Sequence, residues 1–134
     1  MTVWLYTVCR NEELLMPYFL RHYSKFVDRI IVYDANSTDR TREIVSQQPQ
    51  VELRRFDYCE KFDDVAFVEF TSKQYLEARG RADWVIWVDA DEFLFHNNIT
   101  ALLNSYLERG ITLPLTQGYS MVSKEPPRGN LQIY

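Results

Sequence analysis

The feature that most constrains the fold is a set of short apolar runs separated by stretches with helical spacing. The runs are TVWLYTV at residues 2–8, RIIVYD at 29–34 and WVIWV at 84–88. Residues with branched or aromatic side chains dominate them, and a run that is apolar throughout is typical of a strand covered on both faces. We therefore expect buried strands at these three places, with the run at 84–88 the most buried.

Two further strands are expected from other patterns. VELRRF at 51–56 alternates between apolar and polar residues, which places it nearer the sheet edge, and ITLPLT at 111–116 is strand-like. Beyond Ser123 the pattern fades into SKEPPRGNLQIY, whose adjacent prolines and Gly-Asn pair indicate a loop or an extended arm.

Apolar residues at helical spacing predict four helices between the runs. They are expected at 15–26, around Ile44 and Val45, at 64–79 and at 100–109. Pro17 suits the first turn of the first helix, and Ser37 or Thr38 is the candidate N-cap of the second. Gly80 and Gly110 are expected to end the last two. The inward face of the third is expected to carry Phe67, Val68, Thr71, Tyr75 and Ala78.

Strands that alternate with helices of this length imply βαβ units with right-handed crossovers and a mostly parallel sheet. The expected fold class is α/β, in three α/β/α layers. The expected division is one α/β domain over residues 1–123, followed over 124–134 by an extended C-terminal arm or the start of a missing segment.

Composition excludes several classes of protein. The formal charge is −4 and no Lys/Arg stripe stands out, which argues against nucleic acid as a partner. Cys9 and Cys59 stand apart without metal-binding spacing, which fits a reducing compartment. The amino terminus lacks the basic region of a signal peptide, and no apolar run is long enough to span a bilayer. A soluble, cytoplasmic chain is expected, with peripheral membrane association left open.

Polar residues gather where the predicted strands end. Parallel strands bring their carboxyl ends to one edge, where ligands of open α/β sheets bind. The residues at these ends are Cys9, Arg10, Asn11 and Glu12; Asp34, Asn36, Ser37 and Asp39; and Asp89, Asp91 and Glu92. Clustered carboxylates repel one another unless they stay hydrated, protonate or share a cation. We therefore expect Mg²⁺ or Mn²⁺ here. If strand geometry continues past residue 88, Asp89 and Asp91 leave the same face and reach one ion.

Three motifs together resemble a known family. TVCRNEE, IIVYDANSTDRT and DWVIWVDADEFL resemble, in order and spacing, the nucleotide-binding half of GT-A glycosyltransferases similar to glycosyltransferase family two. The resemblance covers Thr2 to about Leu103. It implies that the loop after the first strand cradles the nucleotide and that Asp34 reads the base, commonly uracil. It also implies that Asp91 contacts a metal and Asp89 the ribose or the metal shell. The loop residues are Val8, Cys9, Arg10, Asn11 and Glu12.

The function implied by this resemblance is metal-dependent transfer of a sugar from a nucleoside-diphosphate sugar, UDP-linked, to an unknown acceptor, whether glycan, lipid or protein. Family members are usually longer, and after Glu108 the only acidic residue is Glu125, so no catalytic base is assigned. The chain is expected to be truncated, to be completed by a partner, or to bind without transferring. A non-catalytic module that binds a sugar nucleotide, a protein or a glycan is the alternative.

Several side chains are left with open roles. Asp89 and Asp91 form a D-x-D motif, and Glu92 follows this motif without an assigned function. His22 is expected to pack at the core boundary, whereas His96 is a candidate for metal or phosphate contact. Arg10 either binds phosphate or pairs with a neighbouring glutamate. Ser37, Thr38 and Asp39 are interpreted as a helix cap more than as ligand contacts.

Overall fold

A computed structural model describes residues 1–57, 64–120 and 122. The chain divides into two compact units, Met1–Leu94 and Phe95–Tyr134, which are described separately. The predicted boundary at residue 123, the predicted arm, Cys59 and Glu125 all lie outside the described residues, so the predicted division stays a prediction.

The first unit is built on a parallel sheet. Its strands are β1 (Val3–Cys9), β2 (Arg29–Asp34), β3 (Val51–Arg55) and β4 (Trp84–Trp87). They lie in the order β3-β2-β1-β4, and every pair is parallel. β2 has the predicted bounds, β1 is displaced by one residue, and β3 lies at an edge as expected.

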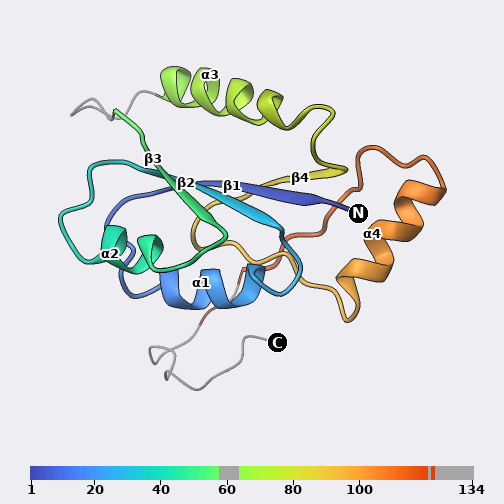
Figure 1. Cartoon of the computed structure of the whole chain (residues 1–134), viewed down its shortest axis with the longest axis horizontal. Helices are drawn as coiled ribbons and strands as arrows, with labels where there is room; N and C mark the ends of the chain where they lie inside the picture. The colour runs from blue at the N-terminus through green and yellow to red at the C-terminus, as the bar shows by residue number, and fades with distance from the viewer. Residues whose placement is uncertain (58–63, 121, 123–134) are drawn as a thin grey trace. The chain divides into compact units, whose positions relative to one another are not determined.

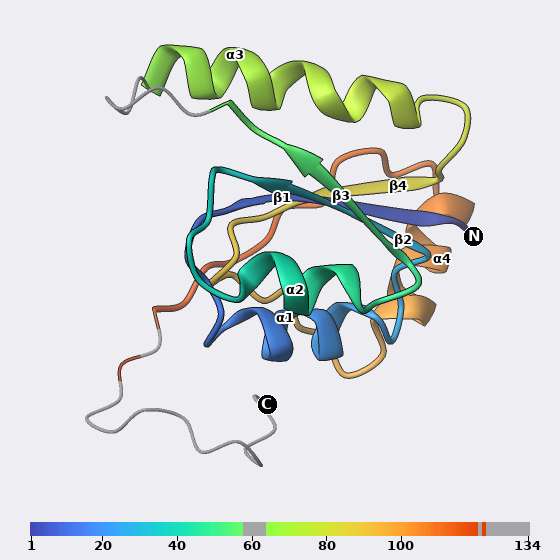
Figure 2. The same cartoon turned by 60° about the vertical axis from the view of Figure 1, so that its left-hand side comes forward.

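Helices cover both faces of this sheet, which confirms the three-layer α/β architecture. Figures 1 and 2 show α1 (Met16–Tyr23) and α2 (Thr41–Ser46) on one face and α3 (Asp64–Gln74) on the other. A short 3-10 helix, η1 (Tyr75–Ala78), continues α3, and Gly80 follows it with φ +72°. Pro17 lies in the first turn of α1, as predicted.

The buried centre consists of β1 and β2. Leu5, Tyr6, Ile30 and Ile31 have no exposed surface, because each of these strands has a neighbour on both sides and helices above and below. Toward α3, the aromatic rings of Tyr6 and Trp87 stack with centroids 5.6 Å apart. The prediction that the apolar run at 2–8 is a strand covered on both faces is therefore confirmed.

The prediction that the run at 84–88 is the most buried strand is wrong. β4 spans four residues and, among the described residues of this unit, pairs only with β1. Val85 is 38% exposed. An apolar run indicates burial of its side chains but does not say on how many sides the strand is paired. Here the edge position of β4 leaves part of the strand exposed.

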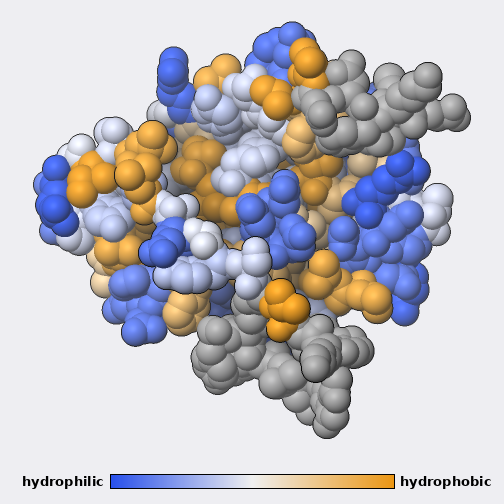
Figure 3. Space-filling view, turned by 180° about the vertical axis from the view of Figure 1, so that it is seen from behind, coloured by the Kyte–Doolittle hydropathy of each residue, from blue (hydrophilic) through white to orange (hydrophobic). Residues whose placement is uncertain are grey.

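The predicted inward face of α3 and η1 is confirmed only in part. Ala78 is buried and the ring of Phe67 contacts Phe56, with centroids 6.1 Å apart. Val68 is 62% and Tyr75 is 42% exposed, and Figure 3 shows hydrophobic side chains on the surface over α3, at the top of the view. Phe70 turns inward instead and contacts Tyr33, with ring centroids 4.9 Å apart. The helix carries apolar residues on most of its sides, so spacing alone could not select the buried face.

In the second unit, α4 (Ile99–Glu108) confirms the predicted fourth helix. The side chain of Asn98 caps it by accepting from the Ala101 N–H at 3.1 Å, and Gly110 follows at φ +67°. The predicted strand at 111–116 is wrong, because no residue of that segment is in a strand and Leu115 is 95% exposed. Pro114 in its middle has no N–H to donate to a neighbouring strand.

A half-buried ionic network fastens η1 to the sheet. The Arg54 guanidinium donates to both carboxylate oxygens of Glu77, at 2.7 and 3.2 Å, and to Glu52 at 2.7 Å. It also donates to the Tyr33 hydroxyl at 2.8 Å, and the Tyr6 hydroxyl donates to Glu77 at 3.1 Å. The hydrogen bond from Arg54 lowers the pKa of Glu77 below its ordinary value of 4.5. Glu77 therefore stabilises the fold in its charged form.

Replacing Glu77 by Gln should lower the free energy of unfolding by about 1–2 kcal/mol at pH 7, because Arg54 loses its charged acceptor. Since the pKa of Glu77 is depressed in the folded state, its contribution is present above the ordinary pKa and is lost as the pH falls through the folded one. Urea denaturation of both proteins at pH 7 and pH 3 should show the difference shrinking. The control is Glu69→Gln on the exposed side of α3, and an equal loss in both variants would contradict the role of the network.

Candidate functional site

The carboxyl ends of three strands meet at one edge of the sheet. Cys9 at the end of β1 lies opposite Asp34 at the end of β2. On the other side of β1, the Val88 N–H donates to the Tyr6 carbonyl at 3.3 Å, so the chain leaves β4 at the same edge. The predicted convergence of the Asp34 and Asp89 segments on one side of the molecule is therefore present.

Asp34 is a buried carboxylate with partners. It is 3% exposed, and its oxygens accept from the Ser37 N–H at 3.2 and 3.3 Å. The guanidinium of Arg42, from α2, lies 3.7 Å away and its side chain is 63% exposed. A ligand bound to Asp34 would therefore lie near the guanidinium of Arg42, which the sequence interpretation did not single out. An acidic residue followed eight positions later by Arg carries no recognisable spacing.

A set of hydrogen bonds, here called the loop clamp, joins the loop after β1 to the loop before α2. The clamp residues are Asn11, Glu12, Glu13, Ser37, Thr38, Asp39, Arg40 and Thr41. Asn11 adopts φ +56°, its N–H donates to Ser37 Oγ at 2.9 Å and its side-chain oxygen accepts from the Thr38 N–H at 2.8 Å. The Glu12 N–H donates to Thr41 Oγ1 at 2.7 Å. The loop after β1, which the sequence predicts to bind the nucleotide, is thus held in place by hydrogen bonds from the segment that leads into α2.

The clamp corrects the predicted helix cap. The N-cap position of α2 is Arg40, without a side-chain cap, so Ser37 and Thr38 do not cap the helix. Asp39 accepts from the Thr41 N–H at 2.9 Å and from the Glu13 N–H at 3.1 Å. Burial opposes the shift, but these bonds and one from the Thr41 hydroxyl lower the pKa of Asp39. Ser37 and Thr38 bond Asn11 instead, because a loop neighbour is nearer than the helix start.

The D-x-D lies in a tight turn. Glu92 N–H donates to the Asp89 carbonyl at 3.0 Å, and the Glu92 carboxylate accepts from the Asp89 N–H at 3.3 Å. Strand geometry ends at Trp87, so the condition for Asp89 and Asp91 to share a strand face is not met. The side chain of Glu92, left without a role by the sequence, closes this turn.

The carboxylates of the loop after β1 and of the D-x-D turn interact electrostatically. Burial, then the negative charges of Asp91 and Asp39, raise the pKa of Glu12. Burial, then Glu92 and Asp91, raise the pKa of Asp89. Carboxyl groups with raised pKa values and carboxylate neighbours have unneutralised charge around them. This edge of the sheet therefore attracts cations.

The other residues of the loop after β1 differ in accessibility. Cys9 is 4% exposed, and burial, then Asp34, raise the pKa of its thiol to about 12. A neutral buried thiol makes Cys9 a packing residue whose side chain faces Asp34. Val8 is half-buried and Arg10 is exposed.

Tyr23 of α1 anchors the chain after the turn. Its hydroxyl donates to the Glu92 carbonyl at 3.0 Å and accepts from the Leu94 N–H at 2.9 Å. His22 Nε2 bonds the Leu94 carbonyl at 2.9 Å, and its ring contacts Phe93, which confirms its expected boundary position. His96 belongs to the second unit, is exposed, and accepts from the Asn98 N–H through Nδ1 at 3.1 Å.

The donor chemistry of the edge fits a hard divalent cation held in part by a ligand. Within residues 1–57, 64–120 and 122, no three His, Cys, Asp or Glu side chains are grouped closely enough to hold an ion by themselves. Mg²⁺ and Mn²⁺ are commonly bound through one or two carboxylates together with phosphate oxygens and water. Asp89 and Asp91 can supply such carboxylates.

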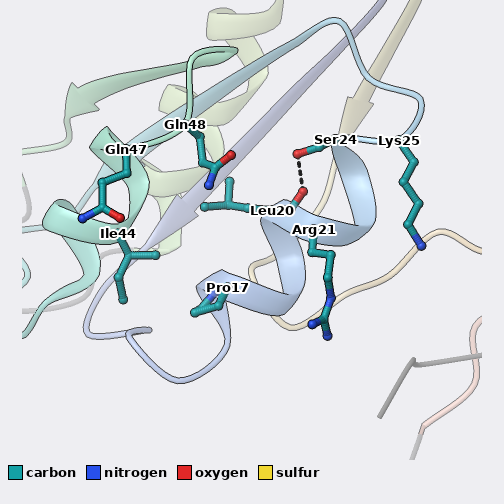
Figure 4. Close-up of a pocket in the computed structure, with 8 residues that line it drawn as sticks. All are labelled: Pro17, Leu20, Arg21, Ser24, Lys25, Ile44, Gln47 and Gln48. Carbon is teal, nitrogen blue, oxygen red and sulfur yellow. Dashed lines mark hydrogen bonds between the residues drawn. The ribbon is translucent and has the colours of Figure 1, made fainter. Parts of the chain in front are cut away.

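A separate groove lies between α1 and α2, with a volume of about 680 Å³. Leu20, Ile44 and Pro17 line its apolar part, and Figure 4 shows Arg21 and Lys25 extending away from Leu20. None of the predicted site residues lines it. The convergence of polar groups therefore favours the carboxyl edge of the sheet as the functional site.

The comparisons with known proteins agree with the geometry. Residues 5–132, nearly the whole chain, match the family described as Glycosyl transferase family 2. A search of curated proteins finds no match to the chain. In the part of the chain that the structure describes, no helix has the length and apolar character needed to cross a membrane.

Replacing Asp89 by Asn should raise the melting temperature of the free protein only slightly, by about 1 °C at pH 7, because Asp89 is exposed and water screens its charge. Its pKa is raised above the ordinary 3.8 in the folded state, so the cost of charging Asp89 begins as the pH rises above 3.8 and is complete above the folded pKa. The gain should shrink as the pH falls through the folded pKa and vanish below 3.8, where Asp89 is protonated in both the folded and the unfolded state. Thermal unfolding at both pH values measures this, with Glu69→Gln as control. A lower melting temperature for Asp89→Asn at pH 7 would refute the charge crowding.

Proposed function

We propose that this chain, which belongs to glycosyl transferase family 2, binds a UDP-linked sugar at the carboxyl edge of its sheet and transfers the sugar to an acceptor. The family supports glycosyltransferase activity in general. The finer proposal concerns the nucleotide, the metal and the residues that hold them. The single observation that carries it is the convergence of Asp34, the Glu12 loop and the Asp89–Glu92 turn at one edge.

The proposed roles follow the positions of the side chains. Asp34 accepts a hydrogen bond from the base, and the adjacent Arg42 balances its charge. The loop of Val8, Cys9, Arg10, Asn11 and Glu12 lies along the nucleotide. The Cys9 thiol is buried, and the Asn11 side-chain oxygen and the Asn11 and Glu12 N–H groups all bond within the loop clamp. The side chain of Arg10, which is exposed, is therefore the contact we favour.

The proposed metal ligands are Asp91 and, directly or through water, Asp89. A bound Mn²⁺ or Mg²⁺ supplies charge that stabilises the negative charge on a departing diphosphate. The protein's own contribution is to hold the carboxylates in a tight turn that Glu92 closes and Tyr23 anchors. Rigid placement of charge lowers the cost of reorganisation during the reaction.

Titration calorimetry with UDP, in the presence and absence of Mn²⁺, tests the proposal. Wild-type protein should bind UDP with heat that depends on Mn²⁺, and Asp91→Asn should weaken this binding by about tenfold or more. Glu69→Gln on α3 should leave affinity unchanged. Absence of metal-dependent heat with every nucleoside diphosphate would overturn the proposal.

The choice of uracil is tested by comparing UDP with CDP. Uracil offers an N3–H to the Asp34 carboxylate, whereas cytosine offers only a lone pair at that atom, so UDP should bind about tenfold more tightly. Asp34→Asn should reduce this preference, since an amide both donates and accepts. Equal affinities in the wild type would assign another role to Asp34.

The alternative function, a module that binds without transferring sugar, gives a different pattern. It predicts nucleotide or glycan binding without release of UDP from a UDP-sugar in the presence of Mn²⁺. The cytoplasmic location and the nature of the acceptor stay predictions from the sequence.

A further inference from the structure

Thr41 is the most enclosed member of the loop clamp. It has no exposed surface, although it is polar. Its hydroxyl accepts from the Glu12 N–H at 2.7 Å, and its position beside the Asp39 carboxylate helps to lower the pKa of that group. A buried hydroxyl that accepts this hydrogen bond ties the peptide of Glu12 to the start of α2.

Glu12 is the point at which this clamp meets the carboxyl edge. Its neighbour Asn11 lies in the left-handed region at φ +56°, which turns the loop back toward α2. The Glu12 side chain lies close enough to Asp91 for the two charges to interact. A displacement of the Glu12 peptide would therefore change the spacing between the loop after β1 and the D-x-D turn.

We propose that Thr41 is a positioning residue of the nucleotide site, and that its buried hydroxyl holds the Glu12 peptide where the loop after β1 can engage a nucleoside diphosphate. The inference rests on the proposed function. Thr41 itself touches no ligand and acts through Glu12, while Asp39 orients its hydroxyl.

The clamp contains an internal comparison that isolates burial. Thr38 also bonds the loop, through its N–H and its hydroxyl to Asn11, but it is exposed. Water can replace a hydroxyl removed from an exposed site. At Thr41 no water has access, so loss of the hydroxyl leaves the Glu12 N–H without a partner. The same Thr→Val change should therefore have different effects at the two positions.

The experiment has two readouts on Thr41→Val, Thr41→Ser, Thr38→Val and wild type. Hydrogen exchange of the Glu12 amide, measured without nucleotide, should be at least about tenfold faster in Thr41→Val and near wild type in the other two. Calorimetry should show about a tenfold loss of affinity for UDP with Mn²⁺ in Thr41→Val, and rescue in Thr41→Ser.

Two further variants separate positioning from stability. Val45→Ala removes a fully buried side chain from α2 without touching the clamp, so it should lower the melting temperature and leave UDP affinity unchanged. Asp39→Asn keeps Thr41 and weakens the acceptor that orients its hydroxyl, so it should show a smaller loss of affinity. If Thr41→Val does not fold, the UDP affinities of Asp39→Asn and Val45→Ala are compared instead. A loss in Asp39→Asn alone supports the positioning role, and an equal loss in both, or no loss in Asp39→Asn, contradicts it.

The outcomes distinguish this inference from the proposed function. Wild-type protein that binds no nucleoside diphosphate overturns the function, and the exchange of the Glu12 amide still tests the clamp. Wild-type binding with unchanged affinity in Thr41→Val, or an equal loss in Thr38→Val or Val45→Ala, overturns the positioning role and leaves the function standing.

Discussion

Parallel pairing of β1 with both β2 and β4 is the constraint on which the site depends. Because β1 lies between its partners and runs in the same direction, three chain segments far apart in sequence end at one edge. Antiparallel pairing at either side would send one segment to the opposite end of the sheet. The acidic character of the edge follows from this arrangement together with the residues that follow each strand.

The acidic edge brings carboxyl groups close enough together to raise the pKa values of Glu12 and Asp89. Carboxylates that crowd one another weaken the free protein, and they persist where a ligand or cation relieves the repulsion. The surrounding structure supplies the compensation. Tyr23 and His22 fasten the chain after the D-x-D turn to α1, and the loop clamp fastens the other side. Rigidity around the edge is thus provided by hydrogen bonds, some between neutral groups, as at Tyr23, and some accepted by carboxylates of the clamp, as at Asp39.

Much of the fold was predictable because it depends on local pattern. The bounds of β2, the Pro17 start of α1 and the Gly80 ending after η1 all follow from single residues or short runs. The errors concern long-range choices. The apolar character of residues 84–88 did not show that β4 has an edge position. Because α3 is apolar on most sides, its pattern did not show that Phe70 joins Phe67 on the inward face while Val68 is exposed. The identity of the acidic residues was predictable, but the hydrogen bonds of Thr41 and the ion pair of Arg42 with Asp34 were not, since they depend on how separate chain segments meet.

The edge position of β4 has a consequence for the protein in solution. Among the described residues of the first unit, its outer side has no strand partner, and WVIW is a short, uncharged sequence with high β-propensity. Such a strand is a template for intermolecular pairing. The four-residue length of β4 itself limits such pairing, and replacing Val85, which is 38% exposed, by lysine would oppose it further.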